Sequence, residues 1–384
     1  MQSVLFINYE YPPIGAGAAT ANFHFATQLA AQGIRVTVLT SAFRNKRGIT
    51  EEEGVIVHRI PAWRKKTGQS SLRQMLAYLV SALLHLPKVV RKHRPDTAVV
   101  FFSFPCGPTG ILLKRLWNIP YSIMLRGGDV PGFEPSLDTI HRMLRPMRRA
   151  VYANASAIIA NSESLRTLAL ESDPDAAISV INNGVDTEFY LPADNRGDAE
   201  HHPFTFLFAG RICTQKNLGV LIKAFAACRS RCDDLKLLMV GEGPELLRLQ
   251  RLAFSLSLEN EVVWEGWCSK ETLRDYYRSS ACFVSPSTNE GMSNTLLEAM
   301  ACGLPILAGD CPANREIVLD GRCGYLVASG DVERLAERMC GYGIERNLAS
   351  FHGSFARSWA QNNYSWENST IKLYSMISHP VASA

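Results

Sequence analysis

The chain has 384 residues, too many for one compact core, so we expect two domains of similar size. Its 47% hydrophobic and 20% charged residues are typical of a soluble globular enzyme, and no run of eighteen apolar residues is present to form a membrane-spanning helix. The net charge is only +4, yet residues 35–149 contain 20 Lys and Arg against 7 Asp and Glu, whereas residues 191–384 contain 19 against 22.

Apolar segments typical of strands alternate with helical patterns along the chain, which favours doubly wound α/β domains. The first segment, MQSVLFINYE, has no basic region before its apolar run, so we interpret it as a strand and not as a signal peptide. Several segments are apolar almost throughout, which indicates parallel strands buried on both faces. The expected strands are VLFINYE, RVTVLTSA, VIVHRI, TAVVFFS, YSIMLRG, AIIANS and ISVINNG in the first half, and FTFLFAG, KLLMVG, VVWEG, CFVSPS and PILAGD in the second.

Two glycines, Gly15 and Gly17, follow the first strand, and a helix is expected to begin near Ala18. Glycine lets the backbone approach a ligand closely, although a tight turn without a ligand is the alternative. A nicotinamide-dinucleotide site would need a third glycine where this chain has Thr20, so that interpretation fails. His24, on a mostly apolar helix face, is expected to pack.

Residues 72–94 combine apolar side chains at helical spacing with a basic end. A core-facing helix explains the spacing, and a helix at a membrane surface is the alternative, because basic amphipathic elements bind anionic lipid. The positive charge of this half predicts an anionic partner, and nucleic acid is the weakest candidate since no nucleic-acid-binding signature accompanies it. The residues concerned are Leu72, Met75, Leu76, Leu79, Val80, Leu83, Leu84, Lys88, Arg91, Lys92 and Arg94, with Trp63–Lys66 and Arg142–Arg149 adding basic charge.

Three aspartates in the rest of the first half are candidates for a functional role or a turn. Asp129 follows a strand, in MLRGGDVPGF, where capping of a turn is one explanation. Asp173 and Asp175 form a D-x-D string after a helical segment, and we expect a solvated turn there and not a metal site. The polar residues 192–203 then have no apolar face and are interpreted as an interdomain linker.

Arg211 and Lys216 follow the strand FTFLFAG. Two fixed cations stabilise the negative charge that grows on a departing diphosphate: arginine grips phosphate oxygens as a fork, and lysine acts as a point charge. The alternative is that both are solvated surface cations.

Glu290 and Glu298 lie eight positions apart in EGMSNTLLEAMACGLP. Glu290 is expected on the loop after the strand ACFVSPS, and Glu298 roughly two turns further along, on the following helix. The start of that helix exposes backbone N–H groups, which suit a phosphate. Two carboxylates that accept hydroxyl hydrogen bonds beside such a helix start predict a site for a sugar nucleotide. An exposed helical carboxylate is the alternative for Glu298.

These segments resemble the retaining glycosyltransferases of family 4, which have the GT-B fold. The resemblance covers essentially the whole chain and rests on EGMSNTLLEAMACGLP, GRICTQK, YPPIGAG, VINNGVDTEFY and YSWENSTIKLYSMI. It implies two Rossmann-like, doubly wound α/β domains that face each other across a cleft, with a C-terminal helix that crosses back to the first domain. We expect an acceptor-binding domain at 1–191, a linker at 192–203, a nucleotide-sugar-binding domain at 204–363 and a returning segment at 364–384.

The resemblance also implies roles for single residues. Glu298 would bind the ribose hydroxyls, and Glu290 would bind the donor sugar. The diphosphate would bind at the start of the helix that carries Glu298. Glu242 and Gly243 would lie near the nucleotide base, with a turn as the alternative, and Trp267 would line the base pocket or pack against the second sheet. Catalytic roles fall to Asp129, Arg211, Lys216 and Glu290, and donor binding to Gly15, Gly17, Glu242, Gly243, Asn294, Thr295, Leu296 and Glu298.

The expected function is transfer of a sugar, with retention, from a UDP- or GDP-sugar to a glycan or lipid-linked acceptor in bacterial-type surface glycan or glycolipid synthesis. No metal or other cofactor is expected, because two cations and a helix start can supply the charge neutralisation. We expect a cytoplasmic protein, peripheral on the inner face of the membrane. The alternatives are a sugar-nucleotide epimerase or hydrolase, and a non-catalytic sugar-nucleotide-binding protein.

Ten cysteines are present without a C-x-x-C pair, and the closest two, Cys228 and Cys232, lie at i, i+4 spacing. Reduced thiols are expected, in preference to a disulfide or zinc framework.

Overall fold

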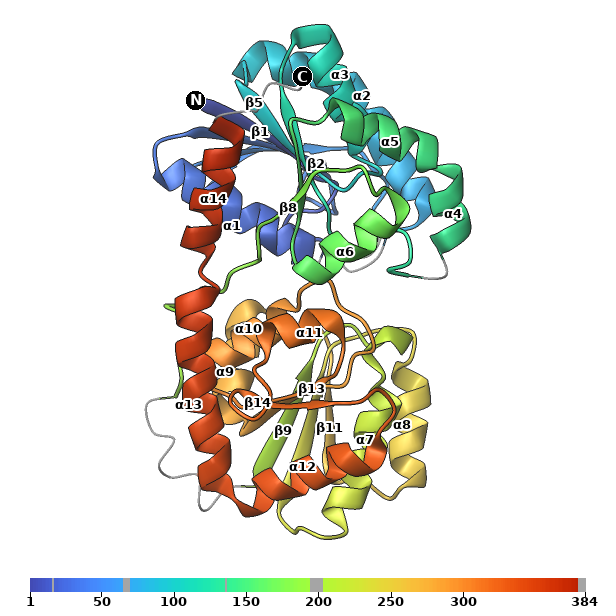
Figure 1. The fold of residues 1–384 in the computed structure, drawn as a ribbon, viewed down its shortest axis with the longest axis vertical. Coiled ribbons are helices and arrows are strands. Elements are labelled where there is room, and N and C mark those ends of the chain that lie inside the picture. Colours follow the sequence, from blue (N-terminus) through green and yellow to red (C-terminus); the bar gives the residue numbers. More distant parts are fainter. Residues whose placement is uncertain (16, 65–69, 135–136, 194–202, 379–384) are drawn as a thin grey trace. The chain divides into compact units, whose positions relative to one another are not determined.

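The structure, a computed structural model, describes residues 1–15, 17–64, 70–134, 137–193 and 203–378. The chain divides into two compact units, unit 1 (Met1–Asn183 and Trp366–Ala384) and unit 2 (Gly184–Ser365) (Figure 1). The first boundary follows Asn183 because Val185 and Tyr190 belong to the apolar core of unit 2. Most of the expected linker, residues 192–203, lies outside the described residues.

Unit 1 contains one eight-stranded sheet in the order β3-β4-β2-β1-β5-β6-β7-β8. All neighbouring strands are parallel except β3 and β4. The central strands β1 and β5 have the sequences SVLFI and TAVVF and are buried on both faces, as expected for parallel strands. The strands are β1 (Ser3–Ile7), β2 (Arg35–Ser41), β3 (Gly48–Glu52), β4 (Val55–Ile60), β5 (Thr97–Phe101), β6 (Tyr121–Met124), β7 (Ala157–Ala160) and β8 (Ile178–Val180).

Helices connect these strands in two directions across the sheet. From β1 the chain moves outward through β2, and from β5 it moves the opposite way through β6. Because such crossovers are right-handed, α1 and α3 lie on opposite faces of the sheet. The helices of this part of the chain are α1 (Gly17–Ala31), α2 (Leu72–His93), α3 (Gly107–Trp117), α4 (Asp138–Met143), α5 (Arg145–Asn154) and α6 (Glu163–Ser172).

The last helix, α14 (Trp366–Ser378), returns to unit 1 as the sequence predicts, and it lies beside α1 in Figure 1. Trp366, Leu373 and Ile377 belong to the core of this unit. The His24 ring stacks on Trp366 with a centroid distance of 4.8 Å and an interplanar angle of 9°. The expected packing role of His24 is therefore confirmed.

Unit 2 contains one fully parallel six-stranded sheet in the order β11-β10-β9-β12-β13-β14. Its strands are β9 (Phe204–Ala209), β10 (Leu235–Val240), β11 (Val262–Glu265), β12 (Cys282–Ser285), β13 (Ile306–Gly309) and β14 (Gly324–Val327). Its helices are α7 (Leu218–Arg229), α8 (Leu246–Ser255), α9 (Lys270–Ser279), α10 (Asn294–Ala301), α11 (Pro312–Ile317), α12 (Val332–Ile344) and α13 (Arg346–Asn363), with a 3-10 turn at Thr214–Lys216.

Two edge strands, β3 and β14, were not expected from the sequence. β3, with the sequence GITEE, is mostly exposed and has no apolar face, so nothing in it marks a strand. β14 has only four residues, GYLV, which is too short for an alternating pattern to be visible.

The interpretation of residues 72–84 as a core-facing stripe is wrong for four of them. Leu72, Leu76, Val80 and Leu84 are 44–70% exposed, although they repeat at every fourth position. A second apolar stripe on the same helix faces the core instead, because α2 is apolar on more than one side. This buried stripe comprises Tyr78, Ala82, Leu86, Val89 and Val90.

The expectation of a solvated turn is also wrong for Asp173. Its carboxylate is buried and accepts hydrogen bonds from the Nε atoms of Arg148 at 2.8 Å and Arg149 at 3.2 Å. Arg148 is itself buried, so its charge is neutralised inside unit 1 and is not presented on the surface.

Replacement of Trp366 by alanine should destabilise unit 1 by about 3–5 kcal/mol, because a large buried side chain is removed and a cavity remains. Hydrogen exchange of the β1 amides measures the free energy of opening of this unit. The Ile371→Ala variant alters the same helix at an exposed position and should change that free energy by less than about 0.5 kcal/mol. Equal effects of the two substitutions would contradict the packing of α14 in this core.

Candidate functional site

The direction of winding in unit 2 reverses between β9 and β12. From β9 the chain proceeds to β10 and β11 on one side, and from β12 it proceeds to β13 and β14 on the other. Ligands of open α/β sheets bind outside the carboxyl ends of the strands at such a switch point. Arg211 and Lys216 lie on the loop after β9, and Glu290 lies on the loop after β12.

The structure joins two of these predicted residues directly. The Lys216 ammonium donates a hydrogen bond to Glu290 Oε1, and the two side chains are only 13% and 9% exposed. These residues are 74 positions apart in the sequence. A charge-assisted hydrogen bond between partly buried groups is stronger than one in water, so the pair fixes the ammonium and the carboxylate side by side.

Gln215, which we did not predict, connects the same two loops. The side-chain amide of Gln215 donates to the Asn289 backbone carbonyl at 2.7 Å. The backbone carbonyl of Gln215 accepts the Thr288 N–H at 3.0 Å. Its Oε1 also accepts a hydrogen bond from Arg211 Nη2 at 3.3 Å. The only signal in the sequence is its place inside GRICTQK. Arg211 is exposed and contacts this glutamine, which in turn binds the residue before Glu290.

The amino end of α10 begins four residues after Glu290. Ser293 caps the helix, and its Oγ accepts the Leu296 N–H at 3.4 Å. The Leu296 amide, expected to bind diphosphate, is therefore already engaged in this structure. Asn294 and Thr295 occupy the first turn, where backbone N–H groups point out of the helix end and carry its partial positive charge.

Glu298 lies on α10 and is not the exposed carboxylate of the alternative interpretation. Its Oε2 accepts a hydrogen bond from the hydroxyl of Tyr277 on α9 at 3.0 Å. Burial raises the pKa of Glu298 to about 7, although the hydrogen bond from Tyr277 acts in the opposite direction. Tyr277 is fully buried and was not predicted, because only the packing of α9 on α10 brings it to the glutamate.

The loop after β10 lies against the loop after β9. The Ile212 N–H donates to the Glu242 carbonyl at 2.8 Å, and a Cβ at Gly243 would lie 2.0 Å from the Ile212 carbonyl oxygen. Only glycine permits this approach, so the turn interpretation accounts for Gly243. The side chain of Glu242 is exposed, and Trp267 is 67% exposed and does not pack into the core.

The remaining predicted residues belong to unit 1. Gly15 lies on the loop after β1 with φ +95°, and a Cβ there would lie 2.6 Å from the Glu10 side chain. Gly17 is the first residue of α1. This loop lies beside the switch point of the first sheet, between β1 and β5.

Asp129 is buried and holds two loops of unit 1 together. One carboxylate oxygen accepts the Ser103 N–H at 2.8 Å and the other accepts the Arg126 N–H at 2.9 Å. Burial raises the pKa of Asp129, and these hydrogen bonds oppose the rise. Because both oxygens are occupied by backbone amides, the geometry favours the turn-capping explanation of this residue.

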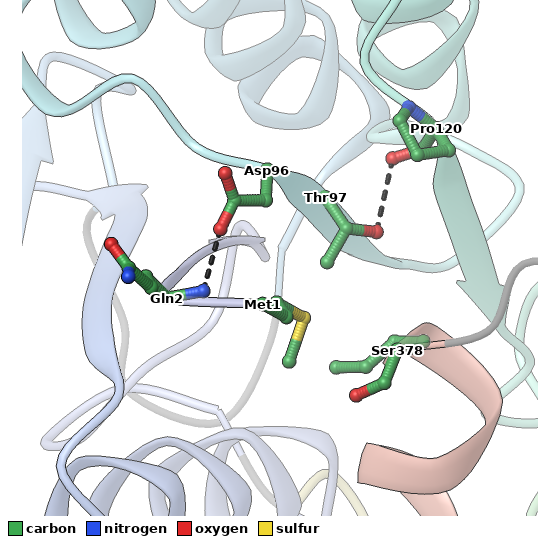
Figure 2. A pocket seen from close by; sticks show the side chains of 7 residues that line it. Met1, Gln2, Asp96, Thr97, Pro120 and Ser378 are labelled. Carbon is green, nitrogen blue, oxygen red and sulfur yellow. Dashed lines mark hydrogen bonds between the residues drawn. The ribbon is translucent and has the colours of Figure 1, made fainter.

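A cavity of about 420 Å³ lies elsewhere in unit 1, at the amino ends of β1 and β5. Figure 2 shows the Gln2 N–H directed at Asp96 Oδ2, a distance of 2.6 Å, and the Thr97 hydroxyl directed at the Pro120 carbonyl. This edge of the sheet is opposite to the carboxyl ends of the strands, where Gly15 and Asp129 lie. The cavity is therefore not part of the predicted site.

Two family models match the chain: "Glycosyltransferase Family 4" over residues 15–189 and "Glycosyl transferases group 1" over residues 203–342. Among curated relatives, a GDP-mannose-dependent alpha-(1-6)-phosphatidylinositol monomannoside mannosyltransferase of Mycolicibacterium smegmatis is 28% identical over 53% of this chain and 57% of its own length. D-inositol 3-phosphate glycosyltransferase 1 of Catenulispora acidiphila is 27% identical over 85% of this chain and 82% of its own.

Solved structures resemble the whole chain. Sucrose-phosphate synthase of Thermosynechococcus elongatus has a TM-score of 0.84 at 20% identity, covering 98% of each chain. HepE of Anabaena in complex with UDP has a TM-score of 0.77 at 18% identity, covering 98% of this chain and 100% of its own. At such identities the likeness concerns the fold.

The pKa of Glu298 leads to a pH-dependent stability. Between its ordinary value of 4.5 and about 7, the folded chain holds a proton that the unfolded chain has lost, so the free energy of unfolding falls as the pH rises, by up to about 1.4 kcal/mol per pH unit. The Glu298→Gln variant has no carboxyl group at this position, so it does not take up or release this proton. Its stability relative to the wild type should therefore increase from pH 4.5 to pH 7 and level off above.

Urea denaturation at a series of pH values measures the difference. The Glu333→Gln variant, exposed on α12, is the control and should give a difference that stays constant across this interval. A constant difference for Glu298→Gln as well would show that the carboxyl ionises normally in the folded chain.

Proposed function

We propose a specific reaction for this chain, which belongs to the group 1 glycosyltransferases of family 4 and has the GT-B fold that its sequence predicts. It transfers a sugar from a UDP- or GDP-sugar to an acceptor hydroxyl, with retention of the anomeric configuration. The observation that carries the proposal is the Lys216–Glu290 ion pair beside the start of α10, at the switch point of the second sheet.

The reaction would use the charges in a fixed order. A bound diphosphate competes with Glu290 for the Lys216 ammonium, and as the glycosidic bond breaks, the growing negative charge on the diphosphate strengthens its bond to that ammonium. Glu290, still adjacent, then faces the positive charge that develops at the anomeric carbon. Because none of the carboxylates in the described parts of the chain is an obvious nucleophile, same-face displacement through an oxocarbenium-like state fits better than a covalent intermediate.

Other residues would hold the donor in place. Glu298, oriented by Tyr277, accepts hydrogen bonds from the ribose hydroxyls, and the first turn of α10 receives the diphosphate. Arg211 reaches toward the phosphates from beside Gln215. No metal ion is included in the proposed reaction, because these cations and the helix end supply the neutralisation.

The names of relatives support the donor and acceptor classes. The mycobacterial relative is GDP-mannose-dependent and acts on a phosphatidylinositol mannoside, and the Anabaena neighbour binds UDP. We propose a lipid-linked or glycan acceptor in surface glycan or glycolipid synthesis, on the cytoplasmic side of the membrane. The base, the sugar and the acceptor are outcomes of the test below.

The test incubates the protein with a panel of UDP- and GDP-sugars and measures nucleoside-diphosphate release with and without lipid extract. Release that depends on the extract, with the sugar recovered on a lipid, supports transfer. Release without any acceptor favours a hydrolase, interconversion of the sugar favours an epimerase, and binding without turnover favours a non-catalytic protein.

The Lys216→Ala variant should lose turnover by a factor on the order of 10²–10³, as for removal of a preorganised charge from a developing anion. Donor affinity should fall less, because the ammonium contributes most when the leaving charge has formed. Steady-state kinetics with the active donor measures both. Lys223→Ala, at an exposed position of α7, is the control and should retain normal turnover. Normal turnover in a folded Lys216→Ala variant would remove Lys216 from the mechanism.

We also propose that unit 1 binds anionic membranes through α2. The exposed stripe Leu72, Leu76, Val80 and Leu84 runs along a helix whose last turn carries Arg91 and Lys92. Apolar side chains next to basic ones are the combination that binds the interface of an anionic bilayer. None of the helices in the described ranges has the length and apolar character needed to span a bilayer. Of the other predicted contacts, Lys65 and Lys66 lie outside these ranges and Arg148 is buried.

Replacing Leu76, Val80 and Leu84 together by serine should abolish co-flotation with vesicles rich in anionic lipid, since the apolar part of the contact is lost. Wild-type binding should also weaken as salt rises. The double variant Leu247→Ser and Phe254→Ser removes exposed apolar side chains from α8 of unit 2 and should float normally. Equal flotation of both variants, or no flotation of the wild type at low salt, would refute binding through α2.

A further inference from the structure

Three cysteine thiols converge at the contact between α7 and α12 in unit 2. Cys228 lies in the last turn of α7, Cys232 just beyond it, and Cys340 in α12. Their Sγ atoms all lie within 4.8 Å of one another. All three are free thiols: Cys228 and Cys340 are buried, and Cys232 is half-buried.

We propose that Cys228, Cys232 and Cys340 form a three-thiolate site for a soft transition-metal cation such as Cu⁺. Thiolates select soft cations, whereas hard cations such as Mg²⁺ and Ca²⁺ take oxygen ligands. A metal–sulfur distance of about 2.3 Å places the sulfurs of a trigonal site about 4 Å apart. The thiols are already near this separation, so side-chain rotations suffice to bring them onto one ion.

The backbone of the turn after α7 holds the first two thiols together. The Cys232 N–H donates to the Cys228 carbonyl at 3.0 Å, which folds the chain back over the helix end. Cys340 approaches from α12, and its Sγ lies 3.8 Å from the same carbonyl oxygen. Cys232 is the ligand nearest to solvent, so it offers the path by which a cation enters.

A cationic side chain lies beside the cluster. Arg229 Nη1 is 3.5 Å from the Cys232 carbonyl oxygen and 2.8 Å from Asp233 Oδ1. A site of three thiolates and one monovalent ion carries negative charge, and because the guanidinium already pairs with Asp233 and, at 3.9 Å, with Glu261, it offsets only a small part of that charge.

Binding exchanges protons for the metal. Each thiol loses its S–H proton to solvent as one sulfur–metal bond forms, and the oxidation state of the ion and the sulfurs does not change. Burial raises the pKa of both Cys228 and Cys232, so these two thiols are protonated before the cation arrives.

The site lies away from the candidate active site. A helix that follows a parallel strand runs back along it, so the carboxyl ends of α7 and α12 lie at the amino edge of the sheet. Consistent with this, a Cβ at Gly343, near the end of α12, would lie 3.2 Å from Leu235, the first residue of β10. A bound ion would tie α7 to α12 and stabilise unit 2 without entering the transfer reaction.

The test titrates the fully reduced protein with Cd²⁺ and, without oxygen, with Cu⁺. We expect thiolate-to-cadmium absorption in the ultraviolet that saturates at one ion per chain, and a rise in Tm with either ion. Cys232→Ser and Cys340→Ser should each weaken binding at least tenfold and abolish the rise. Cys268→Ser removes another half-buried thiol, outside the cluster, and should bind like the wild type.

Far-UV circular dichroism of each variant without metal confirms that it is folded. The Cys232→Ser variant is the decisive one, because a substitution at this partly exposed position disturbs the core least. The proposal is overturned if absorption does not saturate, if Cys232→Ser binds as tightly as Cys268→Ser, or if intact mass shows that the protein isolated from cells contains a disulfide among these three cysteines.

Discussion

The arrangement of the candidate site depends on the close approach of backbone loops at the carboxyl edge of the second sheet. At Gly243 a Cβ would lie 2.0 Å from the Ile212 carbonyl oxygen, and at Gly309 it would lie 2.2 Å from the Ser287 carbonyl oxygen. These contacts leave no room for side chains between neighbouring loops. The loops after β9, β10, β12 and β13 are consequently packed backbone to backbone, and the charged side chains project from a rigid edge.

On that edge, the attraction within the Lys216–Glu290 pair opposes the cost of burying its two charges. Removing either charge from water is unfavourable, and the partner offsets the cost only in a good geometry. Gln215 supplies that geometry by binding the loop of Glu290 from the loop of Lys216. Without ligand, the pair is neutral and stable. In the proposed reaction, an anionic ligand that takes the ammonium would leave a carboxylate in need of a new positive partner, and an oxocarbenium-like sugar would be such a partner.

Much of the fold followed from the sequence, because parallel buried strands are continuous apolar runs and the loops after them carry the glycines and charges. The motif GRICTQK was correctly placed on the loop after β9. Glu290 was correctly placed on the loop after β12, and Glu298 on the helix that follows. The sequence did not reveal Tyr277 or the bonds of Gln215, since both depend on contacts between distant segments. Nor did it show that both carboxylate oxygens of Asp129 accept hydrogen bonds from backbone amides. An aspartate that caps a turn and one that faces a ligand cannot be told apart by the sequence around them.

The failures at α2 and Asp173 have a common cause. A helical period locates apolar and charged faces but does not say what each face contacts, and α2 has two apolar stripes of which only one reaches the core. Likewise, Arg148 counted as surface charge until its buried partner Asp173, 25 residues away, was placed beside it. Because Arg148 is buried in this pair, it is not among the cations that unit 1 presents to a partner, although the net charge of the unit is unchanged. In the proposed membrane binding, the attraction would come from fewer basic residues, with those at the end of α2 acting beside its exposed apolar stripe.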